Sequence, residues 1–138
     1  MKFKKIKGVL VSTLIVTSTL AGSCFAYSAD FKGTWNNGDK IDGSENGRYY
    51  QLDAKNTKIT ATAKVTNTSL GATEKVYIEV RRKTTLGSAR EHYYTSGTYK
   101  NSLTMSTSFK PSKSGKHYLI LRKAQRNVPG TISGTISQ

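Results

Sequence analysis

Apolar and polar residues alternate along most of the chain after residue 26, and no segment there has the periodicity of an amphipathic helix. The clearest run is Gly97–Phe109, in which Tyr99, Leu103, Met105 and Phe109 fall on one side and small polar residues fall on the other. This pattern predicts a β-strand with one face on a hydrophobic core and one face in water.

Several other segments show related patterns. Thr57–Asn67 and Glu74–Thr84 have aliphatic residues at every second position and are predicted to be half-buried strands. His117–Ala124 is apolar on both sides, which indicates a central strand of a sheet. Weaker patterns predict strands at Phe31–Asn36, Arg48–Asp53, Arg90–Thr95 and Gly130–Ser137.

Short strands divided by Gly, Pro and Asn turns predict an all-β fold of about eight strands. We expect a single antiparallel β-sandwich of the jelly-roll or Ig-like kind, with a small β-barrel as second choice. The segment Pro111–Leu121 resembles the late turn and strand of many extracellular jelly-roll or Ig-like modules. That resemblance agrees with the sandwich and implies no particular function.

The first 26 residues have the composition of a cleaved secretory signal peptide. A lysine-rich start precedes the apolar stretch Val9–Leu20, and small residues lead up to Ala26. The apolar stretch is too short to span a membrane, which takes roughly 20 residues. We expect cleavage after Ala26, with cleavage after Ser28 as the alternative. Residues 27–138 then form one secreted bacterial domain.

The single cysteine, Cys24, lies in this leader. In the bacterial lipobox a leucine stands three residues before the modified cysteine, whereas here Leu20 stands four residues before Cys24. We therefore expect Cys24 to be removed with the leader rather than lipid-anchored. The mature chain then has no disulfide, no thiol nucleophile and no cysteine-ligated metal.

The chain is strongly basic, with a formal net charge of +14. Loss of the leader removes four lysines and no acidic residue, which lowers the charge to +10. Almost all of this excess lies after Leu70. A segregated basic charge on an exported domain indicates an anionic partner rather than a particular fold.

Basic residues of the second half form local groups, and Tyr77 lies outward among them on its predicted strand. If the strand ends meet, these residues make one positive patch that can bind a polyanion, with tyrosine rings available to stack on sugars. The predicted contacts are Lys75, Tyr77, Arg81, Arg82, Lys83, Lys113, Lys116, Arg122 and Lys123. Scattered solvated lysines that discourage edge pairing are the alternative interpretation.

We expect a non-catalytic binding protein whose partner is an anionic cell-envelope polymer or an acidic glycan. The main alternative is a cationic antibacterial or membrane-active, toxin-like protein directed at anionic membrane surfaces. A small inhibitor of an extracellular hydrolase also fits, and nucleic acid is a less expected partner. The sequence leaves the oligomeric state open.

Two candidate chemistries receive less weight. Asp39, Asp42 and Glu45 lie in a Gly-rich loop and could ligate calcium, but their spacing does not match an EF-hand and suits an ordinary polar loop.

His92 and His117 are the only histidines, and one could act as a general base beside Asp53, Glu79 or Glu91. The chain has no nucleophile elbow and no histidine pair at metal-ligand spacing. We therefore expect no enzyme activity and no cofactor.

Overall fold

The computed structural model describes residues 27–36, 38–67 and 73–138, so the leader and Cys24 lie outside the described residues. The described residues form nine strands and no helix. These are β1 (Ser28–Trp35), β2 (Lys40–Asp42), β3 (Tyr50–Leu52), β4 (Thr57–Val65), β5 (Val76–Thr84), β6 (Gly87–Thr95), β7 (Ser102–Phe109), β8 (Gly115–Lys123) and β9 (Gly130–Ser137). No helix long and apolar enough to cross a membrane is found in this part of the chain.

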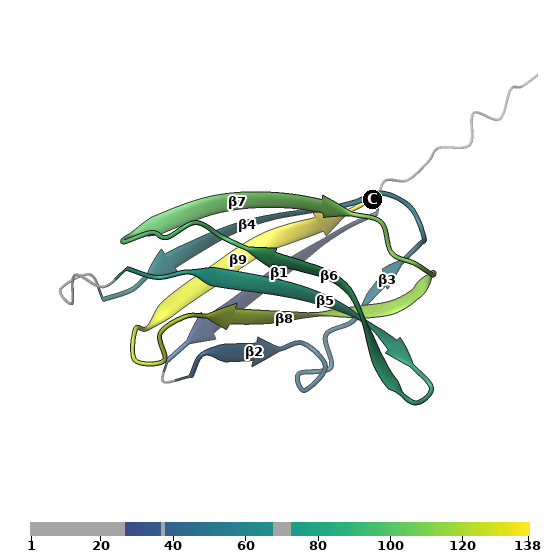
Figure 1. The fold of residues 1–138 in the computed structure, drawn as a ribbon, viewed down its shortest axis with the longest axis horizontal. Coiled ribbons are helices and arrows are strands. Elements are labelled where there is room, and N and C mark those ends of the chain that lie inside the picture. Colours follow the sequence, from purple (N-terminus) through teal and green to yellow (C-terminus); the bar gives the residue numbers. More distant parts are fainter. Residues whose placement is uncertain (1–26, 37, 68–72) are drawn as a thin grey trace, which may run out of the picture.

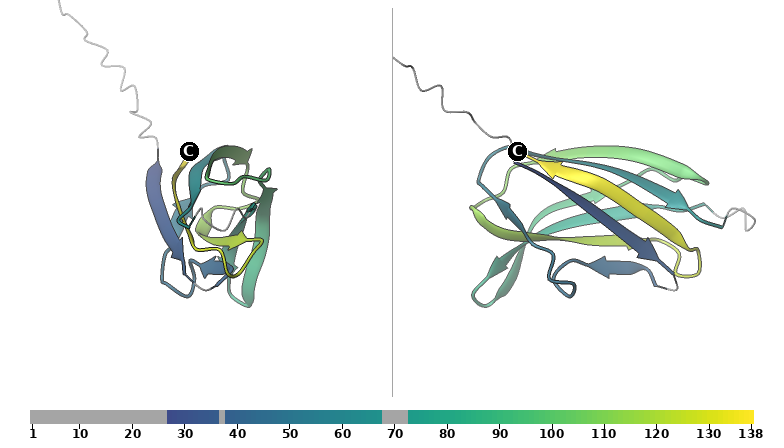
Figure 2. Two further views of the ribbon diagram at one scale, coloured as in Figure 1. Left: turned by 90° about the vertical axis from the view of Figure 1, so that its left-hand side faces the viewer. Right: turned by 180° about the vertical axis from the view of Figure 1, so that it is seen from behind.

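Two antiparallel sheets pack face to face, as Figures 1 and 2 show. Sheet A has the order β1-β9-β4-β7. Sheet B has the order β2-β8-β5-β6, and β3 pairs with the same side of β8 as β2, farther along that strand. The predicted single β-sandwich is therefore confirmed, with nine strands instead of about eight.

The core lies between the inner faces of the two sheets. Ile59, Ala61 and Ala63 of β4 pack there against Ile78 and Val80 of β5, and all five side chains are buried. Because alternate residues of a strand point to opposite faces, the apolar positions of the sequence pattern become this core. Trp35, the only tryptophan, is 2% exposed and belongs to the same cluster.

The structure also revises some predicted strands. β9 has the predicted bounds Gly130–Ser137, whereas β7 begins at Ser102 instead of Gly97. Tyr99 forms an isolated bridge with Glu74 instead of belonging to β7. The short strand β2 was not predicted, because its three residues lie inside a polar, Gly-rich segment.

The prediction that the His117–Ala124 segment is central is confirmed, since β8 pairs with β5 on one side and with β2 and β3 on the other. Leu119 and Leu121 point into the core, while Tyr118 and Ile120 lie on the outer face of sheet B.

The outer faces of the two sheets differ in chemistry. Serines and threonines dominate the outward positions of sheet A, with Lys32, Lys58 and Lys64 among them. The outer face of sheet B instead carries tyrosines, arginines and lysines. The sandwich therefore presents one hydroxyl-rich face and one aromatic, basic face.

Candidate polyanion-binding surface

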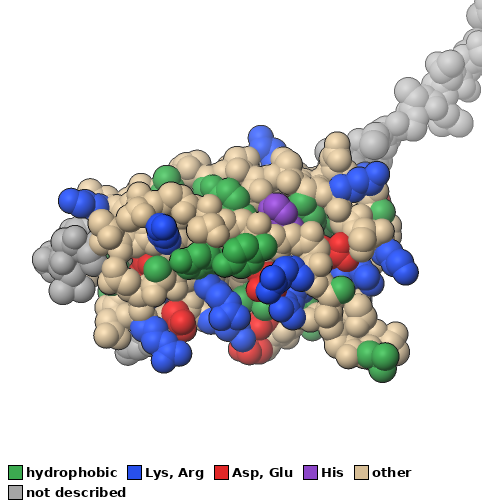
Figure 3. Space-filling model, viewed as in Figure 1, with side chains coloured by type: hydrophobic (Ala, Val, Ile, Leu, Met, Phe, Trp, Pro, Cys, Tyr) green, Lys and Arg blue, Asp and Glu red, His purple; other side chains and the backbone are tan. Residues whose placement is uncertain are grey.

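Strands β5, β6 and β8 bring a group of tyrosine, arginine and lysine side chains to the outer face of sheet B. We call this surface the aromatic–basic face. It consists of Tyr77, Arg81, Lys83, Arg90, Tyr93, Lys116, Tyr118 and Arg122. Figure 3 shows apolar and tyrosine side chains gathered over β5 and β6, with lysine and arginine side chains beside them.

The strand register assembles this face. Tyr77 lies opposite Arg122 of β8, and Arg81 lies opposite Tyr118. On the other side of β5, the pairing with β6 shifts between Val80 and Arg81. This β-bulge places Arg90 opposite Arg81, so two arginines stand side by side on the outer face.

Two tyrosines form the centre of the face. The rings of Tyr77 and Tyr93 stack with their centroids 6.2 Å apart and an interplanar angle of 25°. Tyr93 is 48% exposed, and the guanidinium of Arg90 lies 5.5 Å from the centre of its ring. Exposed ring surface and positive charge are therefore adjacent at this point.

A buried carboxylate holds the two arginines in place. Glu79 is 4% exposed, and its Oε1 accepts hydrogen bonds from Nε of Arg81 at 2.7 Å and from Nε of Arg90 at 2.9 Å. Burial by itself raises the pKa of Glu79, but the hydrogen bonds from the two arginines outweigh it and hold the pKa below its ordinary value. Two guanidinium groups share one carboxylate, so this cluster keeps a positive charge.

A second aromatic group lies beside the first. The Tyr49 and Tyr118 rings meet edge to face with centroids 6.0 Å apart, and Nζ of Lys83 lies 5.4 Å from the centre of the Tyr49 ring. The side chains of Arg122 and Lys116 are exposed, and no acidic partner among the described residues lies within ion-pair distance of them. These cations are free to meet an external anion.

The structure thus brings five predicted contacts onto one face, namely Tyr77, Arg81, Lys83, Lys116 and Arg122. Lys75 and Lys113 are exposed in the segments that precede β5 and β8, at opposite ends of this face. Arg82 points to the inner side of β5, where its Nε donates to Oε1 of Glu91 at 2.8 Å.

The assignment of Lys123 as a surface contact is corrected. Lys123 is 4% exposed, lies on the same side of β8 as Leu119 and Leu121, and donates from Nζ to the backbone oxygens of Gln125 and Arg126. It therefore holds the turn after β8 and does not reach a ligand.

Arg90, Tyr93 and Tyr118 belong to this surface but were not among the predicted contacts, and neither was Tyr49, which packs against Tyr118. The alternation along His117–Ala124 already placed Tyr118 opposite to Leu119, so that residue could have been found. Arg90 and Tyr93 could not have been placed on one face from the sequence, because the bulge in β6 breaks the alternation of side chains between them.

The three acidic residues of the calcium candidate do not come together, because two of them meet at a lysine and the third pairs elsewhere. Nζ of Lys40 lies 3.0 Å from Oδ2 of Asp42 and 3.2 Å from Oε1 of Glu45, while Asp39 pairs with Arg126. No group of three acidic, histidine or cysteine side chains suited to a metal ion occurs among the described residues. The loop's carboxylates are therefore engaged by lysine and arginine.

The histidines occupy structural positions. Nε2 of His92 lies 2.8 Å from Oγ1 of Thr107, and its ring stacks on Phe109. His117 is fully buried, with Nδ1 2.8 Å from the Gly115 carbonyl oxygen. Burial lowers the pKa of both histidines, and no hydrogen bond joins either one to a carboxylate in the described ranges. A histidine–carboxylate pair for general-base catalysis is therefore not assembled here.

No known protein family matches this chain, and no curated protein does so either. Among solved structures, it is similar to the CBM22-1 xylan-binding domain of Paenibacillus barcinonensis Xyn10C, with a TM-score of 0.49, 12% identity and coverage of 79% of this chain and 70% of that one. The pre-peptidase C-terminal domain of Bacillus anthracis collagenase aligns with a TM-score of 0.43 and 15% identity, covering 79% of this chain and 88% of that one. The Yersinia pseudotuberculosis-derived mitogen aligns with a TM-score of 0.39 and 13% identity, covering 80% and 84%. At these values the likeness concerns the β-sandwich architecture and carries no argument about function.

Proposed function

We propose that this protein is a non-catalytic binding domain that holds an anionic cell-envelope polymer or an acidic glycan on the aromatic–basic face. The stacked Tyr77 and Tyr93 rings beside Arg90 and Arg122 carry this proposal. Rings of this kind stack on sugars, and adjacent guanidinium groups pair with carboxylate, sulfate or phosphate groups on the same chain.

An extended ligand suits this surface better than a small one. The face follows the lengths of β5 and β8, which are nine residues each, or about 30 Å at the usual rise per residue. Its cations are spread along these strands and do not converge on a single point. A polymer can meet several of them at once, and its affinity then includes the release of counterions.

The first test measures binding of residues 27–138 to polygalacturonate and to purified teichoic acid, with dextran as a neutral control, over a salt series. We expect retention on the two anionic polymers and none on dextran. Binding should weaken by about tenfold or more between low and moderate salt, because ions screen the charges. Retention on dextran, or a salt-independent affinity, would contradict the proposal.

Variants then locate the surface. Tyr77→Ala and Arg122→Ala each remove a member of the aromatic–basic face and should weaken binding by about fivefold to fiftyfold, which corresponds to roughly 1–2.3 kcal/mol. Lys58→Ala and Lys64→Ala each remove one positive charge, as Arg122→Ala does, but from the outer face of sheet A. They serve as matched controls for charge. Equal losses for both sets would show that overall charge, and not this face, carries the affinity.

One observation favours a second function, action on anionic membranes. Leu86 is 100% exposed at the tip of the β5–β6 hairpin, which Figure 1 shows projecting beyond the sandwich, and Lys83 lies three residues before it on β5. An apolar tip with nearby cations suits insertion into a negatively charged bilayer surface. Dye leakage from anionic vesicles that is lost in Leu86→Ser would support this function in place of polymer binding.

Export is part of the proposal, because the leader lies outside the described residues. The measurement is the N-terminal sequence of the protein recovered from the culture medium, which should begin at Tyr27. A start at Ala29 would indicate the alternative cleavage site, and a lipid on Cys24 would indicate an anchored protein.

A further inference from the structure

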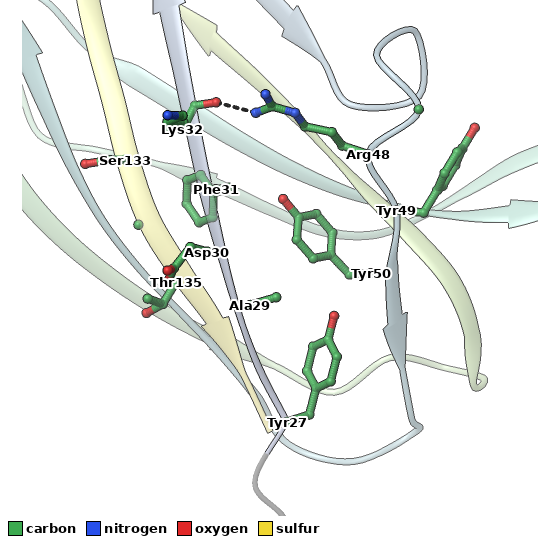
Figure 4. A pocket seen from close by; sticks show the side chains of 12 residues that line it. Tyr27, Ala29, Asp30, Phe31, Lys32, Arg48, Tyr49, Tyr50, Ser133 and Thr135 are labelled. Carbon is green, nitrogen blue, oxygen red and sulfur yellow. Dashed lines mark hydrogen bonds between the residues drawn. The ribbon is translucent and has the colours of Figure 1, made fainter.

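A groove of about 890 Å³ lies along the edge of β1, where the two sheets separate. Tyr27, Ala29 and Phe31 line it from the β1 side, and Arg48 and Tyr50 line it from the side of β3. Tyr49 borders the groove as well, and Figure 4 shows the Tyr27 and Tyr50 rings in the groove with the Tyr49 ring turned away. The residues of the aromatic–basic face itself do not line the groove.

The sandwich closes at one end of this edge and opens at the other. A Cβ atom on Gly33 would lie 2.5 Å from Cδ1 of Ile41, so β1 and β2 touch at that end. Toward Tyr27 the sheets are bridged by side chains alone. Nη1 of Arg48 donates to the Lys32 carbonyl oxygen at 2.6 Å.

The wall of the groove is a strand edge with outward backbone groups that no other described strand pairs, although the Lys32 carbonyl oxygen already accepts from Arg48. β1 pairs with β9 through residues such as Tyr27, whose carbonyl oxygen accepts a hydrogen bond from the Gln138 N–H. In an antiparallel pair, alternate residues turn their N–H and C=O groups away from the partner strand. The Arg48 bond to Lys32 identifies the outward set, to which Ser28 and Asp30 also belong.

This edge lacks two of the features that protect a strand edge. The register of β1 on β9 is continuous over eight residues and contains neither proline nor a bulge, and the charged side chains Asp30 and Lys32 are its only protection of that kind. On the opposite side of the sandwich, by contrast, the edge strands β6 and β7 are joined by the His92–Thr107 hydrogen bond and the His92–Phe109 stack. Among the described strands, β1 is thus a long edge with an open groove beside it.

We propose that this groove binds an extended peptide segment of a partner protein, which adds as a strand to the free edge of β1. The stretch between Tyr27 and Lys32 spans about 17 Å, enough for roughly five residues of an added strand. Side chains on one side of the peptide enter between the Tyr27 and Tyr50 rings and must be apolar. Lys32 and Arg48 lie at the closing end, so the peptide carries a carboxylate there.

Backbone geometry favours a peptide over a saccharide. The outward N–H and C=O groups of a strand repeat at the spacing of another strand, and a peptide satisfies donors and acceptors in the same ladder. Inside the groove, the apolar wall recurs at alternate residues of β1, which matches the alternation of side chains on an added strand.

The test uses the probe acetyl-Thr-Val-Thr-Val-Thr-Val-Glu with a free C-terminus and residues 27–138 of this protein. We expect a Kd below about 1 mM. The amide hydrogens of Ser28, Asp30 and Lys32 should exchange at least tenfold more slowly when the probe is saturating. A reordered peptide with its three valines consecutive should bind at least fivefold more weakly. No binding at about 2 mM probe, or protection elsewhere, would overturn the proposal.

Two N-methylated probes separate strand addition from simple apolar contact. One carries methyl groups on the valine amides and the other on the threonine amides, so only one of them blocks the edge that faces β1. One probe should lose at least tenfold in affinity and the other should keep it. Equal affinity of the two N-methylated probes would overturn strand addition. Slower exchange of the Ser28, Asp30 and Lys32 amides with hexagalacturonate, but not with the peptide, would also overturn it.

A pair of variants tests the site from the protein side. Asp30→Pro removes an outward N–H in the middle of the groove, and Thr34→Pro removes one beyond its closed end, while both leave the β9 ladder intact. Asp30→Pro should abolish probe binding and Thr34→Pro should not. Trp35 fluorescence verifies that each variant folds. If Asp30→Pro does not fold, the N-methylated probes are used instead to test strand addition on the unaltered protein. Arg122→Ala, on the aromatic–basic face, should leave probe binding unchanged.

Discussion

The buried carboxylate of Glu74 joins three segments of the chain, and its removal should destabilise the fold more than that of any exposed acidic residue. Glu74 is 2% exposed, and its backbone pairs with Tyr99 through two hydrogen bonds. Its Oε1 accepts hydrogen bonds from the backbone N–H groups of Lys75 at 2.9 Å, Ala124 at 2.8 Å and Gln125 at 3.1 Å. The side chain therefore organises the turn between β8 and β9.

The magnitude follows from these three bonds. Glu74→Ala leaves the N–H groups of Lys75 and Gln125 without their acceptor, whereas the Ala124 N–H keeps the Lys75 carbonyl oxygen at 3.0 Å. Each unsatisfied buried donor costs about 1–3 kcal/mol. Because water replaces part of the lost bonding near the surface, we expect a total loss of about 3–5 kcal/mol. A domain of this size has a free energy of unfolding of about 5–15 kcal/mol, so the loss is a large fraction of it. Glu74→Gln keeps an oxygen acceptor and should cost about 1–2 kcal/mol.

The assay is equilibrium unfolding in urea followed by the fluorescence of Trp35, which is the only tryptophan and is buried. Glu45→Ala is the control, because Glu45 is exposed and pairs with the partly exposed Lys40, and it should change stability by about 0.5 kcal/mol or less. A loss below about 1 kcal/mol for Glu74→Ala, or equal losses for the Ala and Gln variants, would refute this reasoning.

Three further outcomes are expected. Gly134→Ala should lower the free energy of unfolding by about 3 kcal/mol or more, since its Cβ would collide with the Thr60 carbonyl oxygen of β4. Gly38→Ala is the control, because the space around Gly38 is open, and it should be nearly neutral in thermal unfolding. Lys123→Ala should lower stability by about 2 kcal/mol and leave polyanion affinity per folded molecule unchanged in titration calorimetry. Glu79 and Glu91 have folded-state pKa values held below the ordinary range, against the effect of burial, by their arginine partners and, for Glu91, by Ser112. Their contribution to stability is therefore complete above about pH 5 and is lost as the pH falls through the lowered pKa values. Urea midpoints measured between about pH 7 and pH 3 should fall accordingly. A midpoint that rises on acidification would contradict this assignment.

The candidate surface was only partly predictable from the sequence. Tyr77, Arg81 and Lys83 lie on one side of an alternating segment, so their common outward direction follows from the pattern alone. Lys123 shares the side of Leu119 and Leu121, and the same rule correctly applied would have placed it inside. Arg90 is different, because a bulge between strands sets its direction and no residue pattern marks that bulge.

The sequence by itself determined the all-β character, the residues that face the core and the central place of β8, because side-chain alternation is a local property of a strand. Tertiary structure decided which strands became neighbours, that Arg90 and Arg122 flank the tyrosine pair, and that β1 was left with an open edge. Those features depend on register and sheet order, which arise from contacts between residues far apart in the chain. For this reason the basic charge was visible in the sequence, whereas the surface and the groove were visible only in the fold.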